Sequence, residues 1–156
     1  MLNHVFIAGL AFAALLFTGA DKANGPYLAD GKLAACIKVR ESQSGAVGVT
    51  GDFWIVEPDG TWSTGRFTNE ETDRKRTGKI SPERLEQLVK ELERNNLTTL
   101  LNHGKIEVNP YVIVIEFGKN YHELKPVPDQ SDLEKDKAIR ERYAAILRAV
   151  QAVCKE

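Results

Sequence analysis

A run of β-branched and aromatic residues at Tyr111–Phe117 (YVIVIEF) constrains the fold more than any other part of the sequence. Such residues pack well on a pleated surface, so the run predicts a central strand. Residues 118–120 (GKN) supply a turn, and residues 121–125 are expected to pair back onto the strand. The chain is therefore expected to be built around a mainly antiparallel sheet.

Three further strands are expected nearer the N-terminus. Residues 37–40 alternate apolar and charged side chains, which is the period of a half-buried strand. Residues 53–56 (FWIV) and 61–64 (TWST) flank a Pro-Asp-Gly turn signal at residues 58–60, and this arrangement predicts a hairpin. Residues 69–79 (NEETDRKRTGK) carry many charges and no apolar period, so they are expected to form an exposed loop.

Two helices complete the expected fold. Ser81 can cap the first helix, with Pro82 at its first position and leucines at helical spacing after it. The second is expected to open at the capping-box sequence of residues 131–134 and to carry its apolar stripe to Cys154. The expected fold class is α+β: an antiparallel sheet of about five strands with two helices packed on one face, in the order β-β-β-α-β-β-α.

The first 20 residues indicate export. They contain no Lys, Arg, Asp or Glu, and they hold an apolar run at residues 5–17 that is followed by small residues ending at Ala20. This pattern is typical of a signal peptide at residues 1–20, and an uncleaved anchor is the alternative. Residues 21–35 then form a polar lead segment, and residues 36–156 form a single domain. We expect an extracytoplasmic protein, periplasmic or secreted, without membrane attachment after cleavage.

Cys36 and Cys154 are the only cysteines in the chain. An oxidising compartment allows such a pair to close, so a disulfide between Cys36 and Cys154 is expected. Two free, buried thiols are the alternative. The pair lacks the close spacing of a redox motif.

The sequence holds no pattern typical of a catalytic or metal site. His103 and His122 have no paired ligand spacing, and Ser63 falls in a returning strand instead of a strand-to-helix elbow. An enzyme of unfamiliar design would need His122 to meet a carboxylate such as Glu123 or Glu116 in a deep pocket. The formal net charge is −1 with both signs mixed, which argues against a nucleic-acid partner. We expect no catalytic site, no metal and no cofactor.

The layout of the chain resembles that of emfourins. The resemblance is carried by the Ser- and Gly-rich turn in residues 37–48 (IKVRESQSGAVG), the Ser-Pro-Glu start of a Leu-rich helix at residues 81–83, and the later hairpin and helix. Emfourins are small bacterial inhibitors of thermolysin-type metalloproteases, so the resemblance implies an inhibitor that occupies a protease cleft. Gln43 and Ser44 stand where the family pattern has glycines. The layout is also similar to uncharacterised secreted bacterial domains, which imply no activity.

We therefore expect a monomeric, exported, non-enzymatic binding domain whose partner is a protein, with a protease among the candidates. The expected contact is the Gly-containing loop at residues 42–51, which could fit a cleft or pair with an extended segment. Its candidate binding residues are Ser42, Ser44, Gly45, Ala46, Val47 and Gly48. The alternative is a structural or assembly component of the cell envelope that uses exposed sheet edges.

Overall fold

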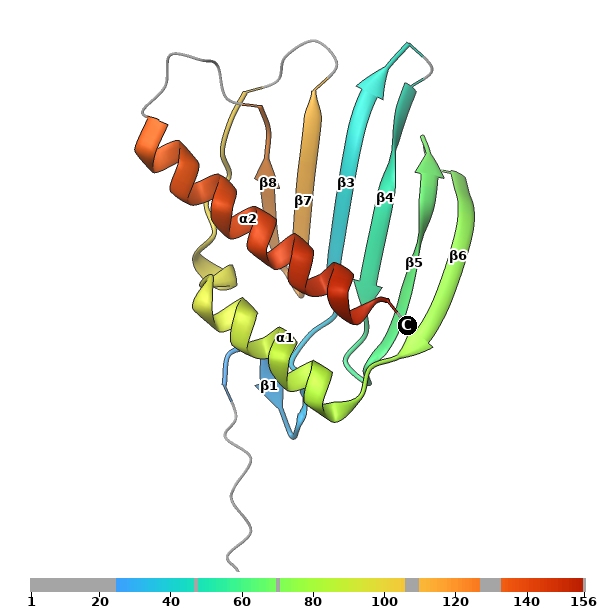
Figure 1. Cartoon of the computed structure of the whole chain (residues 1–156), viewed down its shortest axis with the longest axis vertical. Coiled ribbons are helices and arrows are strands. Elements are labelled where there is room, and N and C mark those ends of the chain that lie inside the picture. Colours follow the sequence, from blue (N-terminus) through green and yellow to red (C-terminus); the bar gives the residue numbers. More distant parts are fainter. Residues whose placement is uncertain (1–24, 47, 70, 106–109, 127–132, 156) are drawn as a thin grey trace, which may run out of the picture.

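The computed structural model describes residues 25–46, 48–69, 71–105, 110–126 and 133–155. A sheet is packed against two helices, so the α+β class and the pair of helices are confirmed (Figure 1). The elements are β1 (Leu28–Ala29), β2 (Lys32–Leu33), β3 (Ile37–Gly45), β4 (Gly48–Val56), β5 (Thr61–Thr68), β6 (Glu71–Lys79), α1 (Pro82–Arg94), η1 (Leu97–Thr99, a 3-10 turn), β7 (Tyr111–Phe117), β8 (Asn120–Leu124) and α2 (Leu133–Val153). The signal peptide expected at residues 1–20 and Val47 of the expected binding loop lie outside the described residues.

The main sheet has six strands in the order β6-β5-β4-β3-β7-β8, and each strand is antiparallel to its neighbours. β3 joins the two parts of the sheet, because it pairs with β4 on one side and with β7 on the other. The prediction that Tyr111–Phe117 form an internal strand is confirmed, since β7 lies between β3 and β8.

The prediction of an exposed loop at residues 69–79 is wrong. Glu71–Lys79 form β6, which pairs with β5 at one edge of the sheet. An edge strand can keep charged, solvated side chains while its backbone joins the ladder, so the absence of an apolar period does not prevent it from pairing. The main sheet therefore has six strands instead of about five, in the order β-β-β-β-α-β-β-α after the small β1–β2 hairpin.

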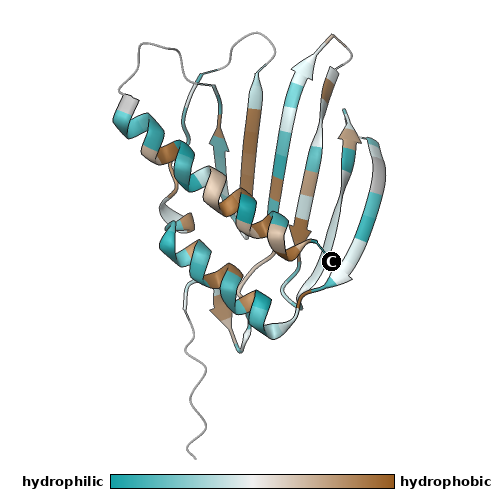
Figure 2. Ribbon diagram, viewed as in Figure 1, coloured by the Kyte–Doolittle hydropathy of each residue, from teal (hydrophilic) through white to brown (hydrophobic). Residues whose placement is uncertain are grey.

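The core lies between the helices and the sheet face that they cover. Side chains on a strand alternate between faces, so only every second residue of β3 and β7 reaches this layer. β7 is the most apolar strand (Figure 2). The main buried residues are Ile37, Val39, Ile113, Ile115 and Phe117 from these strands, and Leu88, Leu92, Tyr143, Ile146 and Val150 from the helices. Burying one such aliphatic side chain stabilises the fold by about 1.5–3 kcal/mol.

Two arginines tie the helices together. Arg84 near the start of α1 donates from Nη1 to the carbonyl of Lys155 at 2.9 Å and from Nη2 to the carbonyl of Ala152, at the end of α2. Arg142 of α2 donates to the carbonyls of Asn95 and Asn96, both at 2.9 Å, just after α1. Carbonyls at the end of each helix, which lack intrahelical partners, are thus capped by a cation of the other helix.

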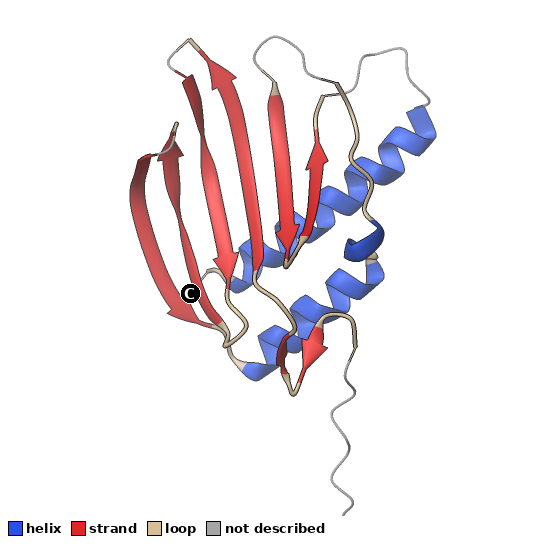
Figure 3. Ribbon diagram, turned by 180° about the vertical axis from the view of Figure 1, so that it is seen from behind, coloured by secondary structure: helices blue, strands red, loops and turns tan. Residues whose placement is uncertain are grey.

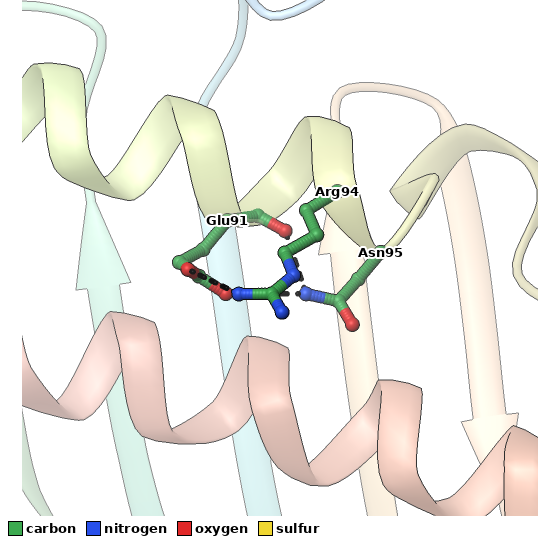
Figure 4. Close-up of polar contacts among 3 residues, drawn as sticks. All are labelled: Glu91, Arg94 and Asn95. Atoms are coloured by element: carbon green, nitrogen blue, oxygen red, sulfur yellow. Dashed lines mark hydrogen bonds and ion pairs between the residues drawn. The ribbon is translucent and has the colours of Figure 1, made fainter.

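The end of α1 is also capped within the helix itself. Asn95 donates from Nδ2 to the carbonyl of Glu91 at 2.8 Å, and Arg94 pairs with the Glu91 carboxylate at 3.8 Å (Figure 4). These contacts and the arginine pair fix α1 and α2 in antiparallel directions on one face of the sheet.

Gly78 of β6 is expected to be sensitive to substitution. A Cβ built on Gly78 would lie 2.4 Å from Cζ2 of Trp62, whose side chain is 4% exposed. Gly78→Ala should therefore lower the free energy of unfolding by about 1–3 kcal/mol, because the buried indole has to move. Urea unfolding measures this. Gly45→Ala is the matched control, since its Cβ would meet nothing within 4 Å; equal losses in both variants would contradict the packing described.

Candidate binding site on the open sheet face

The sheet face that points away from the helices has no other element packed on it in the described part of the chain (Figure 3). Strand alternation places Lys38 and Arg40 of β3 on this face, because their neighbours Ile37 and Val39 point into the core. We call this surface the open face. Its members include Lys38, Arg40, Ser42, Ser44, Val49, Phe53, Ile55, Ser63, Phe67, Lys75, Lys79, Val112, Val114, Glu116, Tyr121 and Glu123.

Apolar side chains line two adjoining grooves on the open face. The first groove, of about 500 Å³, lies over β3 to β6 and contains Phe53, Ile55 and Phe67. The second, also of about 500 Å³, extends toward β7 and contains Val49 and Val112. Arg40, Phe67 and Asn69 line both grooves, so the two form one continuous surface.

The cations of the open face are only partly neutralised. Arg40 pairs with Glu116 at 3.3 Å, and Lys125 pairs with Glu123 at 2.7 Å. Lys38 and Lys75 flank the first groove and form no ion pair with any residue that the structure describes. The groove therefore combines an apolar floor with an excess of positive charge, which favours a partner that presents both apolar side chains and carboxylates.

The expected binding loop at residues 42–51 is a strand hairpin rather than a loop. β3 and β4 stay paired as far as Gly45 and Gly48, so the two strands run together almost to the tip of the hairpin. The side chain of Asn69, at the end of β5, braces this tip by accepting a hydrogen bond from the Val49 N–H at 3.1 Å. Gly48 has a φ of 105°, and a Cβ there would lie 2.1 Å from the Asn69 side-chain oxygen, so only glycine fits.

The structure divides the candidate binding residues into two groups. Ser42 and Ser44 line the second groove of the open face. Gly45, Ala46 and Gly48 lie at the tip of the hairpin, where Gly45 and Ala46 are exposed. The grooves and the hairpin therefore form adjacent parts of one surface.

Sequence reasoning missed the apolar residues of the open face. Phe53 and Ile55 belong to the continuous apolar run of β4, in which Trp54 and Val56 face the core. A run that is apolar at every position signals apolar character on both faces of a sheet. That signal was present in the sequence, but it does not reveal which face remains uncovered.

His122 and the carboxylates named with it as an alternative catalytic set lie on opposite sides of the sheet. His122 points toward the helices, whereas Glu116 and Glu123 belong to the open face. His103 lies with Nε2 2.6 Å from Oδ1 of Asp136, which is 3% exposed on α2. Within the described ranges, no group of three or more His, Cys, Asp or Glu residues is arranged to hold a metal ion.

The expected disulfide between Cys36 and Cys154 is not formed, and both thiols are free. Cys36 precedes β3 and lies beside Glu57, Lys38 and Glu116, on the open-face side. Cys154 follows α2 on the helix side, so the sheet separates the two residues. Burial, with the adjacent Glu57 carboxylate adding to it, raises the pKa of Cys36 to about 11. Burial raises the pKa of Cys154 to about 12.

Comparison of the chain with protein-family models and with curated proteins gives no match. None of the helices described has the length and apolar character needed to cross a membrane.

The cysteine geometry predicts slow thiol chemistry. Because their raised pKa values leave little thiolate, Cys36 and Cys154 should react slowly with iodoacetamide at a pH of about 8. In the denatured chain, both cysteines should react fast with iodoacetamide. A reductant should leave the melting temperature of the folded protein unchanged, and a melting temperature that falls on reduction would show that a disulfide forms.

His122 should make the fold less stable in acid. His122 is 7% exposed, and burial lowers its pKa. The positive charge of Arg142 lowers the pKa further, whereas the hydrogen bond to the Leu100 carbonyl raises it. Folded His122 therefore binds a proton less readily than unfolded His122. Its contribution to stability is complete above about pH 6.5 and is lost as the pH falls below that value. Denaturant unfolding at several pH values measures this. Below about pH 6.5, the free energy of unfolding should fall less steeply with falling pH for His122→Leu than for the wild type. The same pH dependence in both proteins would contradict the prediction.

Proposed function

We propose that this chain is a non-enzymatic protein-binding domain that acts outside the cytoplasm, and that the open face and the β3–β4 hairpin are its contact surface. The observation that carries the proposal is the continuous apolar surface of the two grooves, flanked by Lys38 and Lys75. Location outside the cytoplasm rests on the charge-free apolar N-terminal sequence of residues 1–20.

The extent of this surface supports a protein partner. The residues that line the two grooves come from all six strands of the main sheet, from Lys75 on β6 to Glu123 on β8. A standard protein interface covers about 800 Å² on each partner, which suits a broad surface of this kind. Val49 and Tyr121 are 38% and 49% exposed, so large apolar side chains are available without rearrangement of the core. A partner surface with apolar residues and carboxylates fits this chemistry.

A protease is the first target class to test, and the hairpin is the element proposed to enter its cleft. The β3–β4 tip extends beyond the end of β5 and away from both helices (Figure 1). Its strands are paired as far as Gly45 and Gly48, and the hydrogen bond from the Val49 N–H to Asn69 holds its direction. A braced, protruding segment loses little conformational freedom on binding, which favours affinity. The resemblance to emfourins makes thermolysin-type metalloproteases the class of choice.

Inhibition assays test this function directly. The purified protein should reduce the activity of at least one thermolysin-type protease in a panel, and Ala46→Asp at the hairpin tip should weaken inhibition by about tenfold or more. An unpaired carboxylate is costly to bury in an interface, which is the reason for this loss. Lys119→Asp in the β7–β8 turn, at the other end of the sheet, is the matched control and should retain full potency.

Two results would count against the proposal. No inhibition by a large molar excess removes the inhibitor version. Equal potency of Ala46→Asp and the wild type moves the contact away from the hairpin, and Ile55→Glu then tests whether the open face binds by itself.

A further inference from the structure

The two edges of the main sheet differ in whether their backbone groups are used. At the β8 edge, the segment after η1 runs alongside the strand. The His103 N–H donates to the Glu123 carbonyl at 2.9 Å, the Lys125 N–H donates to the His103 carbonyl at 2.7 Å, and the Glu123 N–H donates to Oδ1 of Asn102 at 2.8 Å. β6 forms the other edge, and within the described residues it pairs with β5 alone.

The register shows which β6 amides point away from the sheet. The Ile80 N–H donates to the Gly60 carbonyl at 2.9 Å, so these two residues form a hydrogen-bonded pair at the start of the β5–β6 ladder. Hydrogen-bonded and non-hydrogen-bonded pairs alternate along antiparallel strands. The amides of Arg76 and Gly78 therefore point toward β5. The amides of Lys75, Thr77 and Lys79 point away from β5, outward from the edge of the sheet.

Cations flank this edge on both faces of the sheet. Lys75 and Lys79 point toward the open face, whereas Arg76 points toward the helix side, where it lines a recess of about 400 Å³ with Trp62 and Lys155. Lys75 and Arg76 have no ion pair with a carboxylate in the described ranges. The whole chain has a net charge of −1, so this positive edge is a local feature.

The same charges determine which strand could pair there. A second copy of residues 75–79, laid antiparallel in register with the first, would place Lys75 opposite Lys79, and like charges opposite each other destabilise a ladder. An acidic strand would instead place its alternating side chains within reach of the cations on both faces.

We propose that β6 accepts an extended acidic segment of a partner protein by strand addition. The partner's carbonyls receive hydrogen bonds from the amides of Lys75, Thr77 and Lys79, and its carboxylates pair with the flanking cations. Backbone pairing supplies the affinity, and the charges supply the selectivity. This inference stands apart from protease inhibition, because it uses the backbone of β6 and not the hairpin tip.

A peptide experiment separates strand addition from simple charge attraction. The probe is a fluorescein-labelled peptide of alternating Glu and Thr residues, and its fluorescence anisotropy is titrated with the full protein. A second peptide has the same sequence but carries an N-methyl group on every central residue, so it keeps the charge and loses its backbone donors. The first should bind, the methylated peptide should bind at least about tenfold more weakly, and a Lys–Thr peptide should not bind.

Amide hydrogen exchange by NMR locates the contact. The acidic peptide should slow exchange at Lys75, Thr77 and Lys79 and leave Arg76 and Gly78 unchanged. The double variant Lys75→Glu/Lys79→Glu should lose at least about tenfold in affinity, whereas Lys90→Glu on the exposed side of α1 should match the wild type.

Several results would overturn the inference. The first is that the acidic peptide does not bind, and the second is that the methylated peptide binds as tightly as the unmethylated one. The third is protection of the Arg76 and Gly78 amides instead of those of Lys75, Thr77 and Lys79. Self-association of the free protein that protects the same outward amides would make a second copy the occupant, and it would overturn the acidic partner.

Discussion

The alternation of side chains along β3 is the constraint on which the rest of the structure depends. Ile37 and Val39 are fully buried against the helix layer, so Lys38 and Arg40 must point to the other side. Because paired residues of adjacent strands point to the same face, the same separation into a buried face and an open face holds for every strand from β6 to β8. Reciprocal capping by Arg84 and Arg142 keeps both helices on one face. The open face is therefore a direct consequence of how the core is built.

The sequence allowed prediction wherever the signal was local. β7 and α1 were predictable because a β-branched run and a Ser-Pro cap act within a few residues. β6 was missed because its stability comes from pairing with β5 and from the contact of Gly78 with Trp62, neither of which leaves an apolar period. The separation of Cys36 from Cys154 by the sheet also depends on long-range packing. The hairpin strands were recognised in part, but the apolar residues of the open face were not assigned, because no local pattern tells which face stays uncovered.

The proposed contacts use two different properties of one sheet. The open face offers apolar side chains and lysines, and the β6 edge offers backbone donors that have no acceptor among the described residues. Lys75 belongs to both surfaces, since it lines the first groove and carries an outward amide. The polar groups on the helix side have another role: the contact between His103 and Asp136 joins α2 to the segment that covers the β8 edge. One edge is thus closed by the chain itself, while no described element covers the opposite edge or the adjoining face.

The open face is expected to be exposed to solvent in the isolated protein. Paramagnetic relaxation of isoleucine methyl groups by a soluble, uncharged gadolinium chelate tests it most directly. The Ile55 methyl signals should broaden strongly, whereas those of Ile37 and Ile115, which are fully buried, should change little. Equal protection of Ile55 and Ile37 would show that the open face is covered, by another part of the chain or by a second copy.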